Sequence, residues 1–209
     1  MTEPFQFSAL QIARLQQQAT RLWHKDPAPV VDGVSLTGNS FASKVLTQHR
    51  ANFDLWHVED QARVPGATDA EIVAVKRAID TINQRRNDLA EQCDVLLLET
   101  VRPSQLPNPD AELNSESPGL MIDRLSILAL KIFHTQEEID RPNAPPGHAE
   151  RNRDRLHLLS EQRDDLVACL DRLWTQVLTG DRRFKVYRQL KMYNDPTLNP
   201  AIYGAGTSQ

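Results

Sequence analysis

Two arginines interrupt apolar stripes that should face the core of a helical protein. Between residues 69 and 98, positions three and four apart are apolar except for Arg86, and between residues 149 and 179 Arg163 interrupts a similar stripe. Burying an unpaired guanidinium is costly, so each arginine must either reach solvent or meet a carboxylate from a neighbouring helix. Ionisable groups gathered inside a protein are typical of binding and catalytic sites, and we expect these arginines to face one.

The segment 119–134 adds an acid, an amine and an imidazole to the same region. Its apolar residues point in every direction, which is typical of a helix at the centre of a bundle. At about 100° per residue, Asp123, Lys131 and His134 fall within one sector of roughly 80°. We interpret these three residues as candidate catalytic groups, with Asp123 or His134 as the acid or base and the arginines stabilising developing charge.

Polar stripes on the two preceding segments offer further contacts to a ligand. In 42–63 the three-four spacing is half polar, and within 69–98 a second stripe at the same spacing carries amides and a carboxylate. Guanidinium groups suit phosphate and carboxylate ligands geometrically, and amides can bind hydroxyl groups. The pattern therefore predicts a site for a small anionic ligand. Its candidate ligand-binding residues are Asn52, His57, Glu59, Arg63, Asp80, Asn83, Arg86, Asn87 and Arg163.

Two other interpretations of these polar residues stay open. One is a divalent-metal site, because carboxylates spread over three helices can hold Mg²⁺ in all-helical phosphohydrolases. The sequence lacks the paired-glutamate signature of such enzymes, and histidine suits a hard cation poorly, so we expect no cofactor. The other is a network of ion pairs that fixes helix register without binding a ligand. The metal interpretation would use His57, Glu59, Asp60, Asp80 and Asp123.

Five helices must position these groups. Proline and glycine cluster in the loops, and the segments between them repeat apolar residues at three and four with few β-branched alternations. Thr68 with Glu71 predicts a capping box. Ser117 followed by Pro118 predicts a helix start, and Gly180 predicts a helix end. We therefore predict an all-α helical bundle. The expected helices lie near residues 8–24, 39–63, 69–98, 119–140 and 149–179.

The composition is that of a globular protein. Its 209 residues are 40% hydrophobic and 25% charged, and we expect one domain over residues 1–209. The net charge of -4 argues against binding along duplex nucleic acid, which needs a basic face. The sequence lacks the apolar run of a signal peptide or a membrane span, so we expect a cytoplasmic protein with no membrane insertion. Wide apolar stripes also allow a homodimer.

The stretch 181–209 differs from the rest of the chain. We expect it to be irregular, and no acid lies between Asp181 and Asp195. Such a basic and aromatic strip could close over a sugar phosphate or dock on an acidic partner. Alternatively, its aromatic rings pack on the bundle while its charges stay in solvent. The residues concerned are Arg182, Arg183, Phe184, Lys185, Tyr187, Arg188, Lys191 and Tyr193.

Four strings of the sequence are distinctive as a set. They are NFDLWHVEDQAR (52–63), KRAIDTINQRRNDLAEQCD (76–94), SPGLMIDRLSILALKIFH (117–134) and FKVYRQLKMYNDPTLNP (184–200). Over about residues 39–203 the chain resembles a bacterial family known as domain of unknown function 4254. Its members are often encoded beside glycosyltransferases that assemble lipopolysaccharide and other surface glycans. The resemblance therefore implies a role in that pathway, and it carries over no catalytic residues.

Residues and resemblance together lead to one main expectation and two alternatives. We expect a cytoplasmic protein of lipopolysaccharide or other surface-polysaccharide biosynthesis, whose buried polar centre binds an anionic sugar-phosphate or nucleotide-type ligand. One alternative is a noncatalytic partner of a glycosyltransferase or another glycan-assembly protein, with the basic stretch as its docking surface. The other is a helical metal-dependent phosphohydrolase. Whether the protein is an enzyme stays open.

Overall fold

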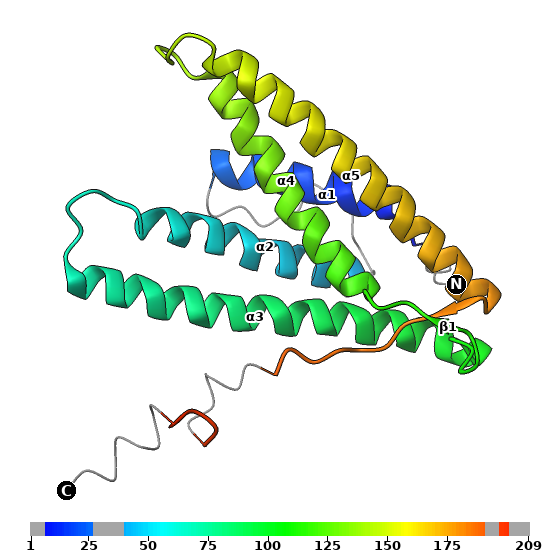
Figure 1. The fold of residues 1–209 in the computed structure, drawn as a ribbon. Coiled ribbons are helices and arrows are strands. Elements are labelled where there is room, and N and C mark those ends of the chain that lie inside the picture. The colour runs from blue at the N-terminus through cyan, green and yellow to red at the C-terminus, as the bar shows by residue number, and fades with distance from the viewer. Residues whose placement is uncertain (1–6, 27–39, 191–196, 201–209) are drawn as a thin grey trace, which may run out of the picture.

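The protein folds mainly into long helices. The computed structural model describes residues 7–26, 40–190 and 197–200 (Figure 1). Within these residues, none of the helices is both long enough and apolar enough to cross a membrane. The predicted all-α fold is confirmed, because each of the five predicted helices overlaps an observed one. The helices are α1 (Ala9–Lys25), α2 (Ser40–Gln61), α3 (Asp69–Val101), α4 (Pro118–Asp140) and α5 (His148–Thr179), with a short 3₁₀ helix, η1 (Arg102–Ser104).

Helix α4 lies at the centre of the bundle. Helices α2 and α3 form one hairpin, α4 and α5 form another, and the two hairpins cross each other (Figure 1). Helix α4 contacts each of the other four long helices. Its buried side chains therefore point in several directions, among them Ile122, Leu125 and Leu128. The expectation that the segment 119–134 forms the central helix is confirmed.

The helix ends form as their sequences predict. At the start of α3, Thr68 Oγ1 accepts a hydrogen bond from the backbone N–H of Glu71, and the Glu71 carboxylate accepts one from the backbone N–H of Thr68. Ser117 caps α4 ahead of Pro118. Gly180 follows α5 with a φ of 81°, in the left-handed region that favours glycine. These residues mark where α3 and α4 begin and where α5 ends.

One continuous apolar core joins the helices. It contains side chains from all five long helices together with Phe184, which follows α5 in the sequence. A smaller apolar cluster includes Trp23 and Phe53. Several polar side chains are buried in the same bundle, and a buried polar group must find hydrogen-bond partners to offset its loss of water. The hydrogen-bond partners of these buried polar groups therefore indicate where a functional site could lie.

The beginning of the C-terminal stretch is attached to the bundle. Strand β2 (Arg182–Arg183) pairs in parallel with β1 (Glu112–Leu113), and Arg182 Nη2 lies 3.1 Å from Glu112 Oε2. Phe184, the next residue, is buried in the core. The strand pairing was not predicted, since two residues are too few to give an alternating pattern. Of the basic and aromatic strip, Lys191 and Tyr193 lie outside the described residues.

Candidate functional site

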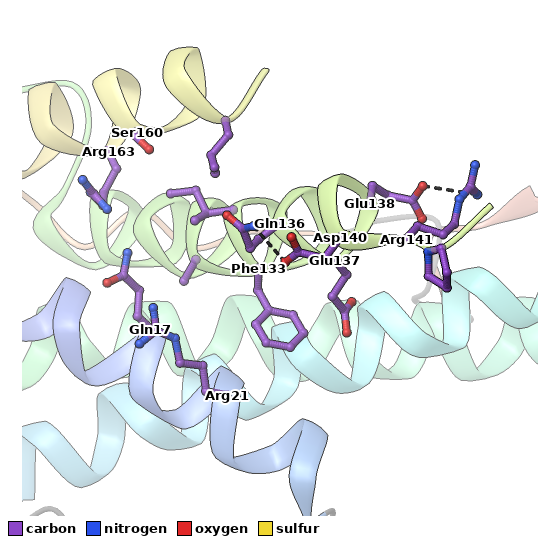
Figure 2. Close-up of a pocket in the computed structure, with 14 residues that line it drawn as sticks. Gln17, Arg21, Phe133, Gln136, Glu137, Glu138, Asp140, Arg141, Ser160 and Arg163 are labelled. Atoms are coloured by element: carbon purple, nitrogen blue, oxygen red, sulfur yellow. Dashed lines mark hydrogen bonds and ion pairs between the residues drawn. The ribbon is translucent and has the colours of Figure 1, made fainter. Parts of the chain in front are cut away.

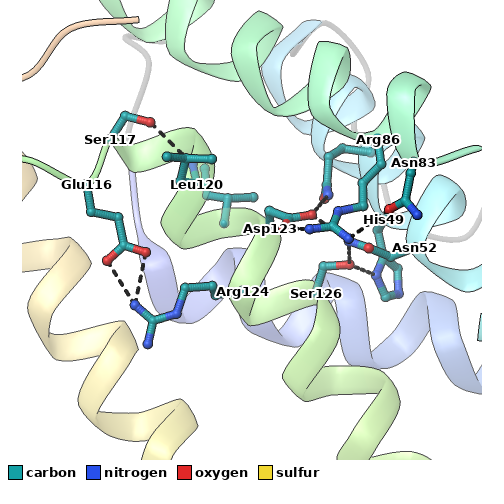
Figure 3. Close-up of polar contacts among 12 residues, drawn as sticks. His49, Asn52, Asn83, Arg86, Glu116, Ser117, Leu120, Asp123, Arg124 and Ser126 are labelled. Carbon is teal, nitrogen blue, oxygen red and sulfur yellow. Dashed lines mark hydrogen bonds and ion pairs between the residues drawn. The ribbon is translucent and has the colours of Figure 1, made fainter. Parts of the chain in front are cut away.

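Asp123 is the hub of a buried polar network between three helices. It lies on α4 and is only 5% exposed. Its Oδ1 accepts hydrogen bonds from Gln48 Nε2 at 2.5 Å and from Asn52 Nδ2 at 2.9 Å, both on α2. Its Oδ2 accepts one from Arg86 Nη2 on α3 at 3.0 Å (Figure 3). The arginine in the apolar stripe of α3 therefore meets an acid from another helix, one of the two outcomes that the sequence left open.

A chain of hydrogen bonds extends this network to α1. The Thr20 hydroxyl donates to the Gln16 carbonyl at 2.9 Å, so it accepts from His49 Nε2, which is also 2.9 Å away. Ser126 Oγ accepts from the Asn52 amide at 2.8 Å and donates to His49 Nδ1 at 2.7 Å (Figure 3). These directions require a neutral imidazole that carries its proton on Nε2. Complete burial lowers the pKa of His49 to about 3, which keeps the ring neutral.

The network leaves three buried polar atoms without a protein partner. They are Gln16 Oε1, Gln48 Oε1 and Arg86 Nε. Buried groups of this kind are few in folded proteins, and each calls for a water molecule, an ion or a ligand to complete its bonding. Arg86 Nη1 has a long contact of 3.3 Å with Asn83 Oδ1, and its Nη2 binds Asp123. Each of these terminal nitrogens carries a second N–H, so Arg86 keeps further donors besides its buried Nε–H.

A cavity of about 330 Å³ lies beside this network, between α2, α3 and α4. We call it the Arg86 cavity. Ile127 and Leu130 of α4 and Leu55 of α2 give it an apolar wall, and the Trp56 indole adds an aromatic one. Its lining therefore combines apolar surface with a few convergent polar groups, which is typical of small-molecule sites. The polar lining residues are Asn52, Glu59, Asp60, Arg63 and Arg86.

Both signs of charge face the Arg86 cavity. Arg63, in the turn after α2, places Nη1 3.0 Å from Glu59 Oε2, and both side chains are well exposed. Arg86, on α3, also lines the cavity. The guanidinium groups can donate to phosphate or carboxylate oxygens, whereas Glu59 and Asp60 can accept from hydroxyl groups. The cavity is thus suited to a ligand that carries both an anionic group and hydroxyls.

The sequence comparison places this site within a known family. Residues 42–186 match the model of a family described as "Protein of unknown function (DUF4254)". This chain belongs to the DUF4254 family. No curated protein and no solved structure matches it. The DUF4254 match contains Asp123, Arg86 and the lining of the Arg86 cavity, and α1 lies outside it.

Arg163 of the DUF4254 domain does not join Arg86. It lines a separate groove of about 830 Å³ between α1, α4 and α5, which also contains Arg21 and Ser160 (Figure 2). Its Nη2 lies 2.8 Å from Asp164 Oδ1, on the same helix. The expectation that Arg163 and Arg86 face one ligand is therefore wrong. Near Arg163, helix α5 borders this groove and not another helix. The Arg163 guanidinium can therefore pair with Asp164 without entering the core.

Asp123, Lys131 and His134 do not converge either. Lys131 is exposed and lines a surface groove between α4 and α5. His134 stacks on Trp56, with ring centroids 4.7 Å apart, and its Nδ1 lies 2.8 Å from Glu137 Oε2. The three residues share a sector of α4, but Asp123 and His134 are eleven residues apart, which is roughly 16 Å along a helix axis. Angular position alone cannot bring such side chains together, so the predicted catalytic trio does not form.

Three predicted ligand residues on α3 have different positions. Asn83 contacts Arg86, as described above. Asp80 forms an ion pair with Lys76 one turn earlier on α3, and Asn87 does not line the Arg86 cavity. Asp80 and Asp123 therefore pair with different cations and do not share a site. Among the described residues, the carboxylates of the metal interpretation do not form a group that could hold a metal ion.

The remaining predicted residue, His57, lies beside two other histidines. Its ring contacts those of His24 and His134, with centroids 5.2 and 5.8 Å away. Among the residues that the structure describes, these three are the group of side chains whose geometry could hold a metal ion. His24 was missed by the sequence reasoning. A signal was present, because Gln16, Thr20 and His24 recur every four residues on the otherwise apolar face of α1.

Proposed function

We propose that this protein binds a small sugar phosphate in the Arg86 cavity and serves surface-polysaccharide assembly. The observation that carries the proposal is the state of Arg86. Asp123 holds the guanidinium at the side of the cavity, and its buried Nε–H has no protein partner. About a quarter of the Arg86 side chain is exposed, so its terminal N–H groups can donate to a ligand oxygen in the cavity.

The charges that line the cavity favour a sugar phosphate over a simple anion. Arg63 and Arg86 attract a phosphate, but Glu59 and Asp60 would repel one that approached without other groups. Sugar hydroxyls would instead donate hydrogen bonds to these carboxylates. The Trp56 ring provides an apolar surface for a sugar or a nucleobase.

The volume of the cavity limits the size of the ligand. At about 330 Å³ it lies at the small end of the range of ligand sites, which is roughly 300–1,000 Å³. A monosaccharide phosphate suits this volume better than a complete nucleotide sugar, whose second half would project into solvent. We therefore place hexose phosphates ahead of nucleotides as ligands.

The hydrogen bonds of Asp123 favour binding over catalysis. Its two oxygens together accept three hydrogen bonds from α2 and α3. These donors occupy both oxygens of the carboxylate and hold it in one orientation against Arg86. We assign Asp123 the role of positioning Arg86 and propose a binding protein that delivers or senses its ligand.

A second candidate function is a noncatalytic partner of a glycosyltransferase. It is favoured by the C-terminal stretch, where Leu190 is 80% exposed and Tyr187 is 41% exposed next to the cations Lys185 and Arg188. Exposed apolar side chains among charges are typical of the edge of a protein interface. Co-elution of the protein with a glycosyltransferase of the same organism, lost on Leu190→Asp, would support this candidate.

Thermal unfolding in the presence of defined ligands tests the proposal. Glucose 1-phosphate, uridine diphosphate glucose and unphosphorylated glucose are compared at equal concentrations. Glucose 1-phosphate should raise the melting temperature most and glucose least, since a ligand that binds only the folded state stabilises it in proportion to its affinity. Equal effects of glucose and glucose 1-phosphate would contradict the assignment of the arginines.

Two matched variants locate the binding. Arg63→Gln removes an exposed cation from the cavity. Arg124→Gln removes an exposed cation of α4 that pairs with Glu116 and does not line the cavity. Neither change touches the core. The shift caused by glucose 1-phosphate should shrink in Arg63→Gln and persist in Arg124→Gln. For the pathway, deletion of the gene should reduce the surface polysaccharide, and the Arg124→Gln gene should restore it where Arg63→Gln does not.

A further inference from the structure

We propose that His24, His57 and His134 form a binding site for a transition-metal ion of the Zn²⁺ type. The three side chains come from α1, α2 and α4, and we call them the histidine cluster. One ring nitrogen of each lies within 4.8 Å of the corresponding atoms of the other two. This inference is independent of the sugar-phosphate proposal, because none of the three residues lines the Arg86 cavity.

Hydrogen bonds fix where two of the three imidazoles carry their protons. His24 Nδ1 lies 2.7 Å from the Thr20 carbonyl oxygen, which can only accept, so Nδ1 carries the hydrogen. His134 Nδ1 lies 2.8 Å from the Glu137 carboxylate and donates in the same way. In a neutral imidazole the other nitrogen, Nε2, then presents a lone pair. That is the form of histidine that binds metals.

Both of these Nε2 atoms are buried and have no hydrogen-bond partner. Two lone pairs cannot satisfy each other, so the cluster lacks an electron-pair acceptor. A buried acceptor without a partner is rare, and two within one group of three side chains call for a shared cause. A cation bound between them would satisfy both at once.

The surroundings hold the rings as a metal site requires. A histidine that binds a metal almost always donates its other N–H to a carboxylate or a backbone carbonyl, which orients the ring and strengthens its lone pair. Glu137 and Thr20 supply these two acceptors. His134 also stacks on Trp56 at 4.7 Å between centroids, and His24 stacks on Phe133 at 4.1 Å.

The directions of the rings agree with a common centre. The planes of the three imidazoles meet one another at 66°, 75° and 84°, so the rings approach from different sides instead of stacking together. In a tetrahedral site with bonds of about 2.0–2.1 Å, ligand atoms lie roughly 3.3 Å apart. Small rotations of the side chains would close the present spacing to that value.

The electrostatics of the cluster favour neutral ligands. Burial lowers the pKa of His57, and the neighbouring His24 and His134 lower it further, whereas Asp60 and Asp54 oppose the change. Carboxylates around the cluster, Glu137 among them, would offset part of the charge of a divalent ion.

The donor set selects the kind of metal. Mg²⁺ and Ca²⁺ prefer oxygen ligands, whereas three imidazoles suit Zn²⁺, Cu²⁺, Ni²⁺ or Co²⁺. Three protein ligands leave a fourth position of a tetrahedral ion for water or a small molecule. The site differs from the carboxylate site that the sequence suggested, both in its ligands and in its metal.

Metal titration of the full chain tests this site. With any histidine tag removed and bound metal extracted by chelator, Zn²⁺ should bind with a stoichiometry of one and raise the melting temperature, and Mg²⁺ should do neither. Co²⁺ should produce the visible absorption of a tetrahedral ion. Absence of both Zn²⁺ binding and a Co²⁺ spectrum would show that the cluster is only a packing of rings, and would overturn the proposal.

Variants distinguish the cluster from adventitious binding. His57→Gln should weaken Zn²⁺ binding by at least about 100-fold, whereas His157→Gln, at an exposed position on α5, should not change it. Glu137→Gln should weaken it by about 10- to 100-fold, because His134 loses its orienting carboxylate, and Glu138→Gln serves as the adjacent control. Glu137 lies outside the core, so this variant tests the site even if a histidine variant misfolds. Equal affinities of Glu137→Gln and Glu138→Gln would contradict the assigned geometry.

Discussion

Arg86 on α3 donates a hydrogen bond to Asp123 on α4 at 3.0 Å, and this pair joins the two crossed hairpins of the bundle. Asp123 is almost fully buried, whereas the Arg86 side chain keeps 24% of its surface exposed. The pair is thus closed on the side of the core and open on the side of the cavity. A ligand can reach the guanidinium without displacing the carboxylate.

Replacement of the hub should weaken the fold measurably. Asp123→Asn leaves Arg86 without its countercharge and places an amide N–H among donors, so we expect a loss of about 2–3 kcal/mol in the free energy of unfolding. Urea unfolding measures it. Asp54→Asn, which breaks a half-exposed ion pair with Arg50 on α2, is the control and should cost less than about 1 kcal/mol. Equal losses would mean that Asp123 does not hold the hairpins together.

Gly119 occupies a position that admits no side chain. A Cβ there would lie 2.2 Å from the Ala90 carbonyl oxygen and 2.8 Å from Asp94 Cγ. The backbone N–H of Gly119 donates to the Asp94 carboxylate at 2.6 Å, so α3 and α4 cannot separate without losing this bond. Gly119→Ala should therefore cost about 2–4 kcal/mol in thermal or urea unfolding.

An exposed position provides the control for Gly119→Ala. Ala70→Ser adds one heavy atom in the first turn of α3, where the side chain faces solvent, and it should change the stability by less than about 0.5 kcal/mol. A cost for Gly119→Ala as small as this would show that α3 and α4 are not so closely packed.

The sequence predicted those features of the fold and the site that leave a local pattern within one helix. The three-four spacing identified Arg86 as a charge in an apolar stripe, and the capping residues Thr68 and Glu71 marked the start of α3. Both are local signals within one helix. Asp123 was selected because it interrupts a helix that is apolar on all sides, and the structure places it against Arg86.

Contacts between helices could not be predicted in the same way. Arg163 shows the same local pattern as Arg86, yet it borders an open groove, because the neighbours of α5 change along its length. The histidine cluster needs one residue from each of three helices, and no spacing along the chain relates His24 to His57 or His134. Such juxtapositions are set by the crossing of the hairpins, which the sequence does not encode as a local pattern.

The buried His49 should make the stability depend on pH. Its pKa falls from 6.5 to about 3 on folding, so below pH 6.5 the unfolded chain takes up a proton that the folded protein does not. This part of the stability is present above about pH 6.5 and is lost as the pH falls toward 3, by on the order of 1 kcal/mol per pH unit. Urea unfolding at pH 7.5 and at pH 5 measures it.

Comparison with His49→Gln isolates this effect from that of Asp94. Burial raises the pKa of Asp94 from 3.8 to about 7, although hydrogen bonds from Ser117 and Gly119 oppose the change, so its contribution to stability is lost as the pH rises and has the opposite sign. The variant keeps Asp94. The stability advantage of the wild type over His49→Gln should therefore shrink between pH 7.5 and pH 5. An advantage that stays constant would mean that His49 is not buried as a neutral ring.

The most direct measurement is a nuclear magnetic resonance titration of the ¹⁵N-labelled protein with glucose 1-phosphate. We predict that the Arg86 Nε–H, the Trp56 indole N–H and the Asn52 side-chain amide shift together and saturate with one dissociation constant, while the Nε–H of Arg124 stays in place. Shifts confined to the groove of Arg21 and Arg163, or no shift at millimolar ligand, would contradict a binding site at Arg86.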